Sequence, residues 1–379
     1  MKICGIIAEY NPFHSGHAYH ISQARRQCSH IIVVMSGNFV QRGEPALFDK
    51  RTRCRVALEH GADLVLELPF SYAVSGADRF AQGAISILNG LGCVDMLSFG
   101  CETDDIAALE RAASLLAEEP PAYQATLRTY LGRGMPFAAA RSTALESLGI
   151  PADRRPNAIL AVEYLKHLKK SGSAIRPLPI LRQGSGYHDS ALSSGFPSAT
   201  ALRALLEDGG SLPPGEPSAT VHVPAVFFRD AFPYILYRLR TMTLAQLRNI
   251  PEVGEGLEYR LEQAARSHCS PDAFLQQVKS KRYAMSRIKR ALIHALLGVT
   301  AEQLSLIHQQ PPYARVLGIK KESLFLLSLL SQHASIPVVT RPASLEHPGL
   351  ALDILAGDIY SLLAHTPARL DYTQPLLVV

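Results

Sequence analysis

The sequence of 379 residues is 47% hydrophobic and 19% charged, with a net charge of +5. This composition is typical of a globular protein with a sizeable core, and it excludes bulk disorder and a collagen-like chain. The length suits two domains, and the mild basic excess permits nucleic-acid binding without requiring it.

Six cysteines are scattered along the chain, and none has a CxxC or zinc-ligand spacing, so we expect no metal cluster. The first residues lack the long apolar region of a secretory signal. No apolar run reaches about 18 residues, so we expect no membrane span. These features predict a soluble, cytoplasmic protein whose cysteines are reduced.

The first half of the chain alternates strand-like and helix-like segments. Strands are predicted at residues 2–8, 31–35, 64–68, 96–99 and near Ile180. Helices are predicted at residues 16–27, 52–60, 77–88, 106–133 and 157–169. The apolar runs lack a two-residue alternation, which indicates strands covered by helices on both faces. We therefore expect an α/β fold with a doubly wound, mostly parallel sheet, in which ligands bind beyond the carboxyl ends of the strands.

Residues 209–217 are rich in glycine and proline and predict a linker. The segments after it are mainly helical, at residues 230–240, 256–267, 271–278, 287–297 and 322–332, with a short strand near Val338. We therefore expect a catalytic domain over residues 1–208 and a mainly α-helical domain over residues 218–379.

The loop after the first strand carries the most informative motif. An Asn11-Pro12 turn is followed by His14-Ser15-Gly16-His17 at the start of a helix. Glycine lets a ligand approach the backbone closely, and a helix N-terminus favours a phosphate. Two imidazoles three residues apart lie on one face of a helical turn and can reach the same anion. The alternative is a polar turn with incidental histidines, but the strand before it and the helix after it favour a nucleotide site.

This segment resembles the HxGH signature of the nucleotidyltransferase superfamily, in which the two histidines bind ATP phosphates. The hexapeptide Ser198-Ala199-Thr200-Ala201-Leu202-Arg203 resembles the SxTxxR segment that closes the triphosphate site in that superfamily. The alternative for this hexapeptide is an ordinary helix capped by Ser198 or Thr200.

Longer motifs narrow the resemblance to the tRNA(Met) cytidine acetate ligases. The similarity to this family is found at residues 5–19, 34–46, 49–53, 63–69, 97–100, 155–160 and 186–189. It continues more weakly at residues 255–258, 281–283 and 313–318, so it spans nearly the whole chain.

The resemblance implies a fold, a reaction and a set of site residues. The fold is a HIGH-type, Rossmann-like nucleotidyltransferase domain followed by a helical domain that binds tRNA. Acetate would attack the α-phosphate of ATP to give acetyl-adenylate and diphosphate, and the N4 amine of the wobble cytidine of elongator tRNA(Met) would take the acetyl group. His14, His17 and Arg203 are the implied catalytic residues, and we expect Mg²⁺ with the ATP. The implied ATP-binding residues are Ile7, Ala8, Glu9, Tyr10, Asn11, Pro12, Phe13, His14, Ser15, Gly16, His17, Ala18, Tyr19, His20, Gly100, Asn157, Arg182, Ser198 and Thr200.

Two further segments are candidates for contact with the second substrates. The first follows the second strand, and we expect it to shape the acetate pocket or to meet the anticodon; its alternative is a solvated loop with a helix cap at residue 49. The second is the basic run over residues 279–290, which we expect to hold tRNA phosphates while its tyrosine stacks on a base or sugar. The alternative for this run is the exposed face of an amphipathic helix. The candidate residues are Asn38, Gln41, Arg42, Asp49, Lys50, Lys281, Arg282, Tyr283, Arg287 and Arg290.

Two other classes of function share some of these features. A small-molecule adenylyltransferase would carry the same HxGH and SxTxxR segments, but the helical domain and the basic run favour a large anionic substrate. An RNA-binding scaffold with a decayed site is disfavoured by the intact His14, Gly16 and His17. The sequence leaves the oligomeric state open.

Overall fold

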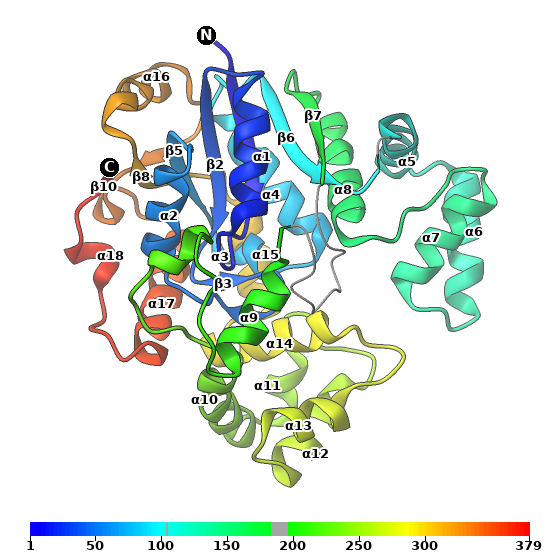
Figure 1. The fold of residues 1–379 in the computed structure, drawn as a ribbon. Helices are drawn as coiled ribbons and strands as arrows, with labels where there is room; N and C mark the ends of the chain where they lie inside the picture. Colours follow the sequence, from blue (N-terminus) through cyan, green and yellow to red (C-terminus); the bar gives the residue numbers. More distant parts are fainter. Residues whose placement is uncertain (104, 183–195) are drawn as a thin grey trace.

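The computed structural model describes residues 1–103, 105–182 and 196–379 (Figure 1). The family-like motif at residues 186–189 therefore lies outside the described residues. One mostly parallel sheet organises the chain, with the strand order β10-β8-β5-β2-β1-β6-β7 and with β9 paired to β8. This arrangement confirms the predicted α/β fold class.

Five consecutive strands of the sheet are parallel and agree with the strands predicted from the first half of the sequence. They are β1 (Ile3–Ala8), β2 (His30–Ser36), β5 (Leu64–Leu68), β6 (Met96–Cys101) and β7 (Arg176–Leu181). A separate two-residue hairpin, β3 (Phe39–Val40) with β4 (Glu44–Pro45), follows β2.

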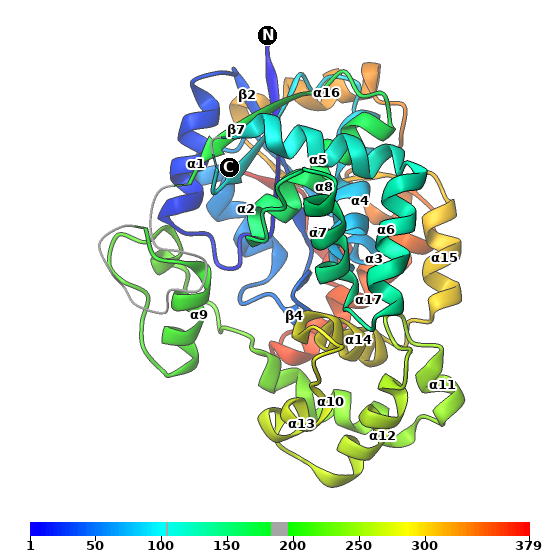
Figure 2. The same cartoon turned by 90° about the vertical axis from the view of Figure 1, so that its right-hand side faces the viewer.

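Helices cover both faces of the sheet (Figures 1 and 2). On one face, α1 (Ser15–Arg25) and α2 (Lys50–Glu59) bury Ile21 and Val56 against Ile6 and Val33. The opposite face packs against α4 (Ala77–Gly90), α5 (Ile106–Glu118), α8 (Pro156–Lys170) and α16 (Phe325–His333). Two buried faces explain why the strands read as continuous apolar runs.

The helical prediction for residues 106–133 is confirmed, but this segment contains two helices. The chain forms α5 and then α6 (Pro121–Gly132), with α7 (Phe137–Ser147) after them. Glu119 has φ of +44°, and Pro120 and Pro121 follow it, so the first helix ends there. Helices α6 and α7 pack together and protrude at the right of Figure 1.

The helical segments predicted after the linker are confirmed. They are α10 (Phe228–Thr241), α12 (Leu257–Ser267), α13 (Pro271–Val278), α14 (Met285–Leu297) and α16. The structure adds α9 (Ala199–Glu207) before the linker, and α11 (Leu244–Arg248), α15 (Ala301–Gln309), α17 (Pro348–Leu363) and α18 (Leu370–Thr373) after it, besides the four-residue α3 (Phe70–Ala73). None of the described helices is by itself long and apolar enough to cross a membrane; α14 and α15 pass that test only as a pair, which is bent by 90°.

The predicted division at residues 209–217 needs one correction. Strand β8 (Ala314–Ile319) pairs antiparallel with β5, and β9 (Val338–Val339) and β10 (Leu377–Val378) pair with β8, so the C-terminal part of the chain extends the sheet. The core of the helical region also includes Phe39 and Phe70 from the N-terminal part. Both halves of the chain therefore share buried surface.

Candidate active site

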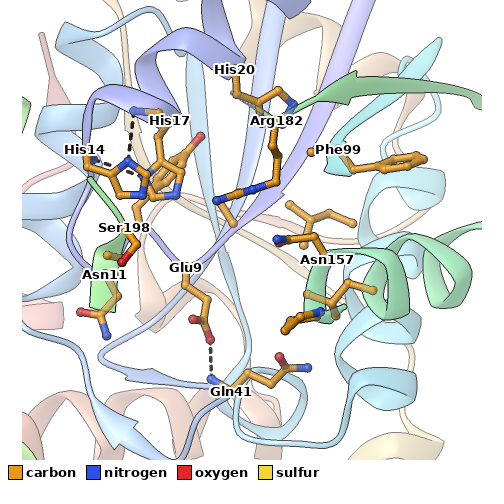
Figure 3. Close-up of a pocket in the computed structure, with 18 of the residues that line it drawn as sticks. Glu9, Asn11, His14, His17, His20, Gln41, Phe99, Asn157, Arg182 and Ser198 are labelled. Carbon is orange, nitrogen blue, oxygen red and sulfur yellow. Dashed lines mark hydrogen bonds between the residues drawn. The ribbon is translucent and has the colours of Figure 1, made fainter. Parts of the chain in front are cut away.

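A cleft of about 460 Å³ lies at the carboxyl ends of β1, β6 and β7 (Figure 3). The chain runs from β1 outward through β2 and β5, and then crosses to β6 on the other side of β1. The cleft lies at this change of direction, which is where open parallel sheets bind ligands. Its walls come from the loop after β1 and from the first turns of α1, α8 and α9.

His14 and His17 cap the helix that begins at the cleft. Nδ1 of His14 accepts a hydrogen bond from the Gly16 amide at 3.1 Å, and Nδ1 of His17 accepts one from the His14 amide at 3.2 Å (Figure 3). The two rings lie 3.7 Å apart, measured between their centroids. Because a backbone amide can only donate, both Nδ1 atoms are unprotonated, and each neutral ring carries its proton on Nε2. Each ring therefore keeps one N–H donor for a ligand.

The surroundings of the two histidines keep their rings uncharged at neutral pH. Burial lowers the pKa of His14 to about 3, and the charges of Arg182 and Arg203 act in the same direction. Burial also holds the pKa of His17 well below its usual value, with further contributions from His14, Arg182 and His20. The arginines thus supply the positive charge of the cleft, and the imidazoles supply neutral donors.

The SxTxxR segment reaches the same cleft from the start of α9. Arg203 donates from Nη1 to the Asn11 carbonyl at 2.6 Å and from Nη2 to Oγ1 of Thr200 at 3.2 Å. Ser198 is the N-cap of α9, since its Oγ accepts from the Ala201 amide at 3.1 Å. The capping alternative is therefore confirmed for Ser198. The same segment also lines the cleft beside the histidines.

Gly100, Asn157, Arg182 and His20 line the opposite part of the cleft. Gly100 lies inside β6 rather than after it, and a Cβ atom there would lie 3.3 Å from Cγ of Arg182, so the backbone approaches that side chain closely. Nδ2 of Asn157 donates to Oε1 of Glu102 at 2.5 Å. His20 lies 2.8 Å from Oγ of Ser98, measured from Nε2, and burial lowers the pKa of His20 to about 4.

Four members of the predicted ATP loop do not line the cleft. Pro12 and Phe13 are buried, and Ala18 packs in the same core as Phe13. Ser15 instead contacts the linker: its amide and its Oγ both donate to the Glu216 carboxylate, at 2.9 and 2.7 Å. The sequence did not reveal Glu216, because the glycines and prolines around it gave no sign of this contact.

The segment after β2 divides between the cleft and the protein interior. Gln41 and Arg42 line the cleft, and Nη1 of Arg42 donates to Oγ1 of Thr200 at 3.3 Å. Asp49 is the N-cap of α2, so the capping alternative is confirmed for it. Asn38 accepts from the Lys50 amide at 2.7 Å.

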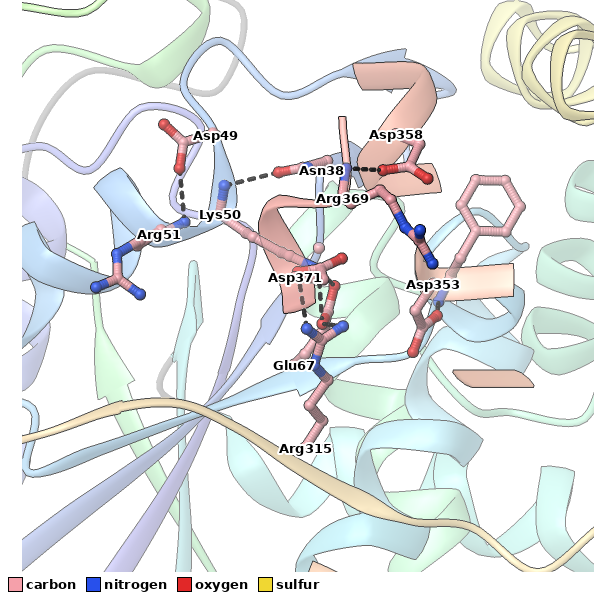
Figure 4. A network of polar contacts seen from close by, with 12 residues as sticks. Asn38, Asp49, Lys50, Arg51, Glu67, Arg315, Asp353, Asp358, Arg369 and Asp371 are labelled. Atoms are coloured by element: carbon pink, nitrogen blue, oxygen red, sulfur yellow. Dashed lines mark hydrogen bonds and ion pairs between the residues drawn. The ribbon is translucent and has the colours of Figure 1, made fainter. Parts of the chain in front are cut away.

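Lys50 belongs to a buried network on the other side of this segment (Figure 4). Its Nζ lies 2.9 Å from both Glu67 and Asp371, and Arg315 pairs with the same two carboxylates at 2.9 and 2.7 Å. Asn38, Asp49 and Lys50 line a second cavity of about 330 Å³, together with Arg315 and Asp371 of this network. Lys50 is therefore paired with Glu67 and Asp371, and it does not line the cleft that holds the histidines.

Arg53 ends the segment that we expected to shape the acetate pocket or to meet the anticodon, but its side chain is only 1% exposed. Its guanidinium donates to the carbonyls of Glu9 at 2.6 Å, Ser36 at 3.1 Å, Phe48 at 2.8 Å and also Gly37. One side chain thus joins the ends of β1 and β2 to the loop that follows β2.

The basic run over residues 279–290 is less free than predicted. Arg290 binds Glu252 with two hydrogen bonds of 2.8 Å, and Arg287 pairs with Glu255 at 3.0 Å. Tyr283 is 5% exposed and donates to the Glu255 carbonyl at 2.5 Å, so the prediction that its ring stacks on tRNA is wrong for this structure. Lys281 and Arg282 are the members of the candidate group that face solvent.

Known proteins resemble this chain over its full length. A family model described as HIGH Nucleotidyl Transferase matches residues 1–374. A tRNA(Met) cytidine acetate ligase of Clostridium kluyveri is 39% identical over 406 residues, covering 100% of this chain and 99% of that protein. The protein of the same name from Acetivibrio thermocellus is 35% identical, with 100% of both chains covered.

Two crystal structures of Thermotoga maritima TmcAL have the same fold at 33% identity, each with 100% of both chains covered. The apo form has a TM-score of 0.93, and the form bound with alpha-thio ATP has a TM-score of 0.90. With HxGH and SxTxxR segments that face one cleft and with relatives that match it from end to end, the chain belongs to the tRNA(Met) cytidine acetate ligase family of HIGH nucleotidyltransferases.

Proposed function

We propose that the cleft activates acetate with ATP and then transfers the acetyl group to N4 of the wobble cytidine of elongator tRNA(Met). The observation that carries this proposal is the meeting of the HxGH and SxTxxR segments, through the 2.6 Å bond from Arg203 to the Asn11 carbonyl. ATP chemistry belongs to residues 1–208 in this proposal, and tRNA binding belongs mainly to residues 218–379. A tRNA substrate would make the enzyme cytoplasmic.

The first step needs little covalent chemistry from the protein. Acetate attacks the α-phosphate in line, and negative charge develops on the departing diphosphate. The Nε2–H groups of His14 and His17 donate to these oxygens, while Arg182 and Arg203 supply positive charge. Donors that are held in place before the reaction stabilise such charge without reorganising.

The remaining cleft residues position the two small substrates. The absence of a side chain at Gly100 leaves room for the nucleotide, and Asn157 contacts its adenine or ribose. The lining of the cleft also includes Gln41, Arg42, Gly76 and Ala77. These residues suit acetate, because a guanidinium binds its carboxylate and small residues accommodate its methyl group.

A Mg²⁺ ion would travel with the triphosphate rather than bind to a protein cage. The described residues that line the cleft include one carboxylate and no second acid beside it, a donor set that does not build a magnesium site. Elsewhere in the described chain, Asp78, Glu163 and His167 place ligand atoms within 4.8 Å of one another. The ammonium of Lys166 pairs with both of these carboxylates and so takes the place of a cation there.

The test is to incubate the enzyme with ATP, labelled acetate and bulk tRNA, and to locate the label. We expect ATP-dependent label in N4-acetylcytidine, and no label in a tRNA(Met) transcript whose wobble cytidine is replaced by uridine. If the enzyme releases no diphosphate and labels no tRNA, the proposal is refuted. Diphosphate release that depends on another small acceptor, and not on acetate, would favour the small-molecule adenylyltransferase.

A further inference from the structure

The negative charge of the Glu9 carboxylate is unexpected in a cleft whose other polar residues suit an anion. Glu9 follows β1, and it is the one acidic side chain among the described residues that line the cleft. Its neighbours there include His14, His17, Arg182 and Arg203, which suit a polyanion. A carboxylate in such a site repels the triphosphate, so its presence needs a reason other than ATP binding.

The structure holds this carboxylate in a defined position. The Gln41 amide donates to Oε1 at 2.7 Å, and the buried Arg53 guanidinium holds the Glu9 carbonyl at 2.6 Å. In the described part of the chain, no hydrogen bond to Oε2 of Glu9 is found. One oxygen is therefore anchored, while the other remains available to a ligand in the cleft.

Glu9 also lies where two parts of the cleft meet. Figure 3 shows its carboxylate between the histidine pair and Gln41. Beyond Gln41, the lining continues to Ser286 and Arg290 of α14, which belong to the helical region. A nucleotide bound at the histidines and a tRNA nucleobase that enters from the helical region would meet beside Glu9.

We propose that Glu9 is the general base of the acetyl-transfer step, an assignment that rests on the function proposed above. The N4 amine attacks the carbonyl carbon of acetyl-adenylate, and the bond from this carbon to the phosphate oxygen of AMP breaks. The N4 proton passes to Oε2 of Glu9, giving AMP, N4-acetylcytidine and a protonated carboxyl that later releases its proton to water. Attack makes the nitrogen positively charged and acidic, so a weakly basic carboxylate is an adequate acceptor.

The substitution Glu9→Gln tests this role, because the amide oxygen can still accept from the Gln41 amide. Acetate-dependent exchange of diphosphate into ATP reports the ATP contact that the family resemblance implies for Glu9, and it should fall by less than about tenfold, since that step needs no base. Single-turnover transfer from enzyme-bound acetyl-adenylate to tRNA should fall by roughly 10²- to 10⁴-fold. Trapping of acetyl-adenylate by hydroxylamine, a strong nucleophile, should fall no further than the diphosphate exchange does. Glu9→Asp should restore part of the transfer rate, and the exposed Glu59→Gln serves as the charge-matched control.

Two results with the Glu9→Gln variant would overturn the assignment. Equal losses of diphosphate exchange and tRNA acetylation would tie Glu9 to the nucleotide or its magnesium, and unchanged acetylation would remove it from the chemistry. A wild-type enzyme that gives acetyl hydroxamate but never labels tRNA would refute the proposed function itself, and with it this role for Glu9.

Discussion

Protonation of His14 should couple the catalytic loop to the stability of the fold. The pKa of His14 is about 3 in the folded protein, against 6.5 for an ordinary histidine. Below pH 6.5 the unfolded chain therefore binds a proton that the folded chain does not, and the free energy of unfolding falls as the pH falls. Above pH 6.5 both states are neutral, so the effect disappears. Between pH 7.5 and 5.0 this one group should cost about 2 kcal/mol.

The substitution His14→Asn isolates this effect. Asparagine is a good N-cap and can still accept from the Gly16 amide, so stability at pH 7.5 should stay within about 1 kcal/mol of wild type. On acidification the variant should lose about 2 kcal/mol less than wild type, while His17 and His20 contribute in the same direction to both proteins. Urea unfolding at pH 7.5 and 5.0, followed by circular dichroism and fluorescence, measures the difference. Equal acid losses in the two proteins would refute a buried, neutral His14.

Three further predictions concern the substrates. His17→Ala should reduce acetyl-adenylate formation by roughly 10²-fold in a folded protein, as measured by diphosphate exchange, and wild-type exchange would contradict its role as a phosphate donor. Gly100→Val should weaken ATP binding by about tenfold or more, because even a Cβ atom at this position would press on Arg182. Titration calorimetry measures the affinity for ATP, and an unchanged affinity would show that Gly100 does not belong to the ATP site. Neutralising Lys281 and Arg282 together should flatten the salt slope of tRNA binding by up to about two units, at about 0.9 per duplex phosphate contact, and leave diphosphate exchange unchanged. A wild-type slope would exclude both from the tRNA surface.

The elements that could be predicted are those whose own residues form a recognisable apolar run or motif. Strand β2 is apolar from Ile31 to Met35, because helices cover both faces of the sheet. The HxGH motif was also readable, since His14 and His17 cap their own helix and lie in one loop.

The features that the sequence did not predict depend on distant partners. Strand β8 was missed because Arg315 interrupts its apolar run, and this charge is tolerated only through Glu67 and Asp371. The basic run was misjudged for a related reason. Arg287 and Arg290 are paired with Glu255 and Glu252, which precede the run in sequence and were not counted with it.

The anchoring of the HxGH loop follows the same physical logic. In each histidine, Nδ1 accepts a hydrogen bond from a backbone amide, so only Nε2 can bind the phosphate. The loop must therefore hold each ring in position. Distant residues do this. Among them, Arg53 holds the Glu9 carbonyl, the Leu47 amide binds Oδ1 of Asn11 at 2.7 Å, and Glu216 binds Ser15. A displacement of a catalytic group by about 1 Å can reduce the rate by about 10²-fold. These anchoring contacts therefore affect the reaction rate although they do not touch the substrate. Because Glu216 lies in the linker to the helical region, its two hydrogen bonds with Ser15 tie that linker to the first turn of α1, between the two histidines.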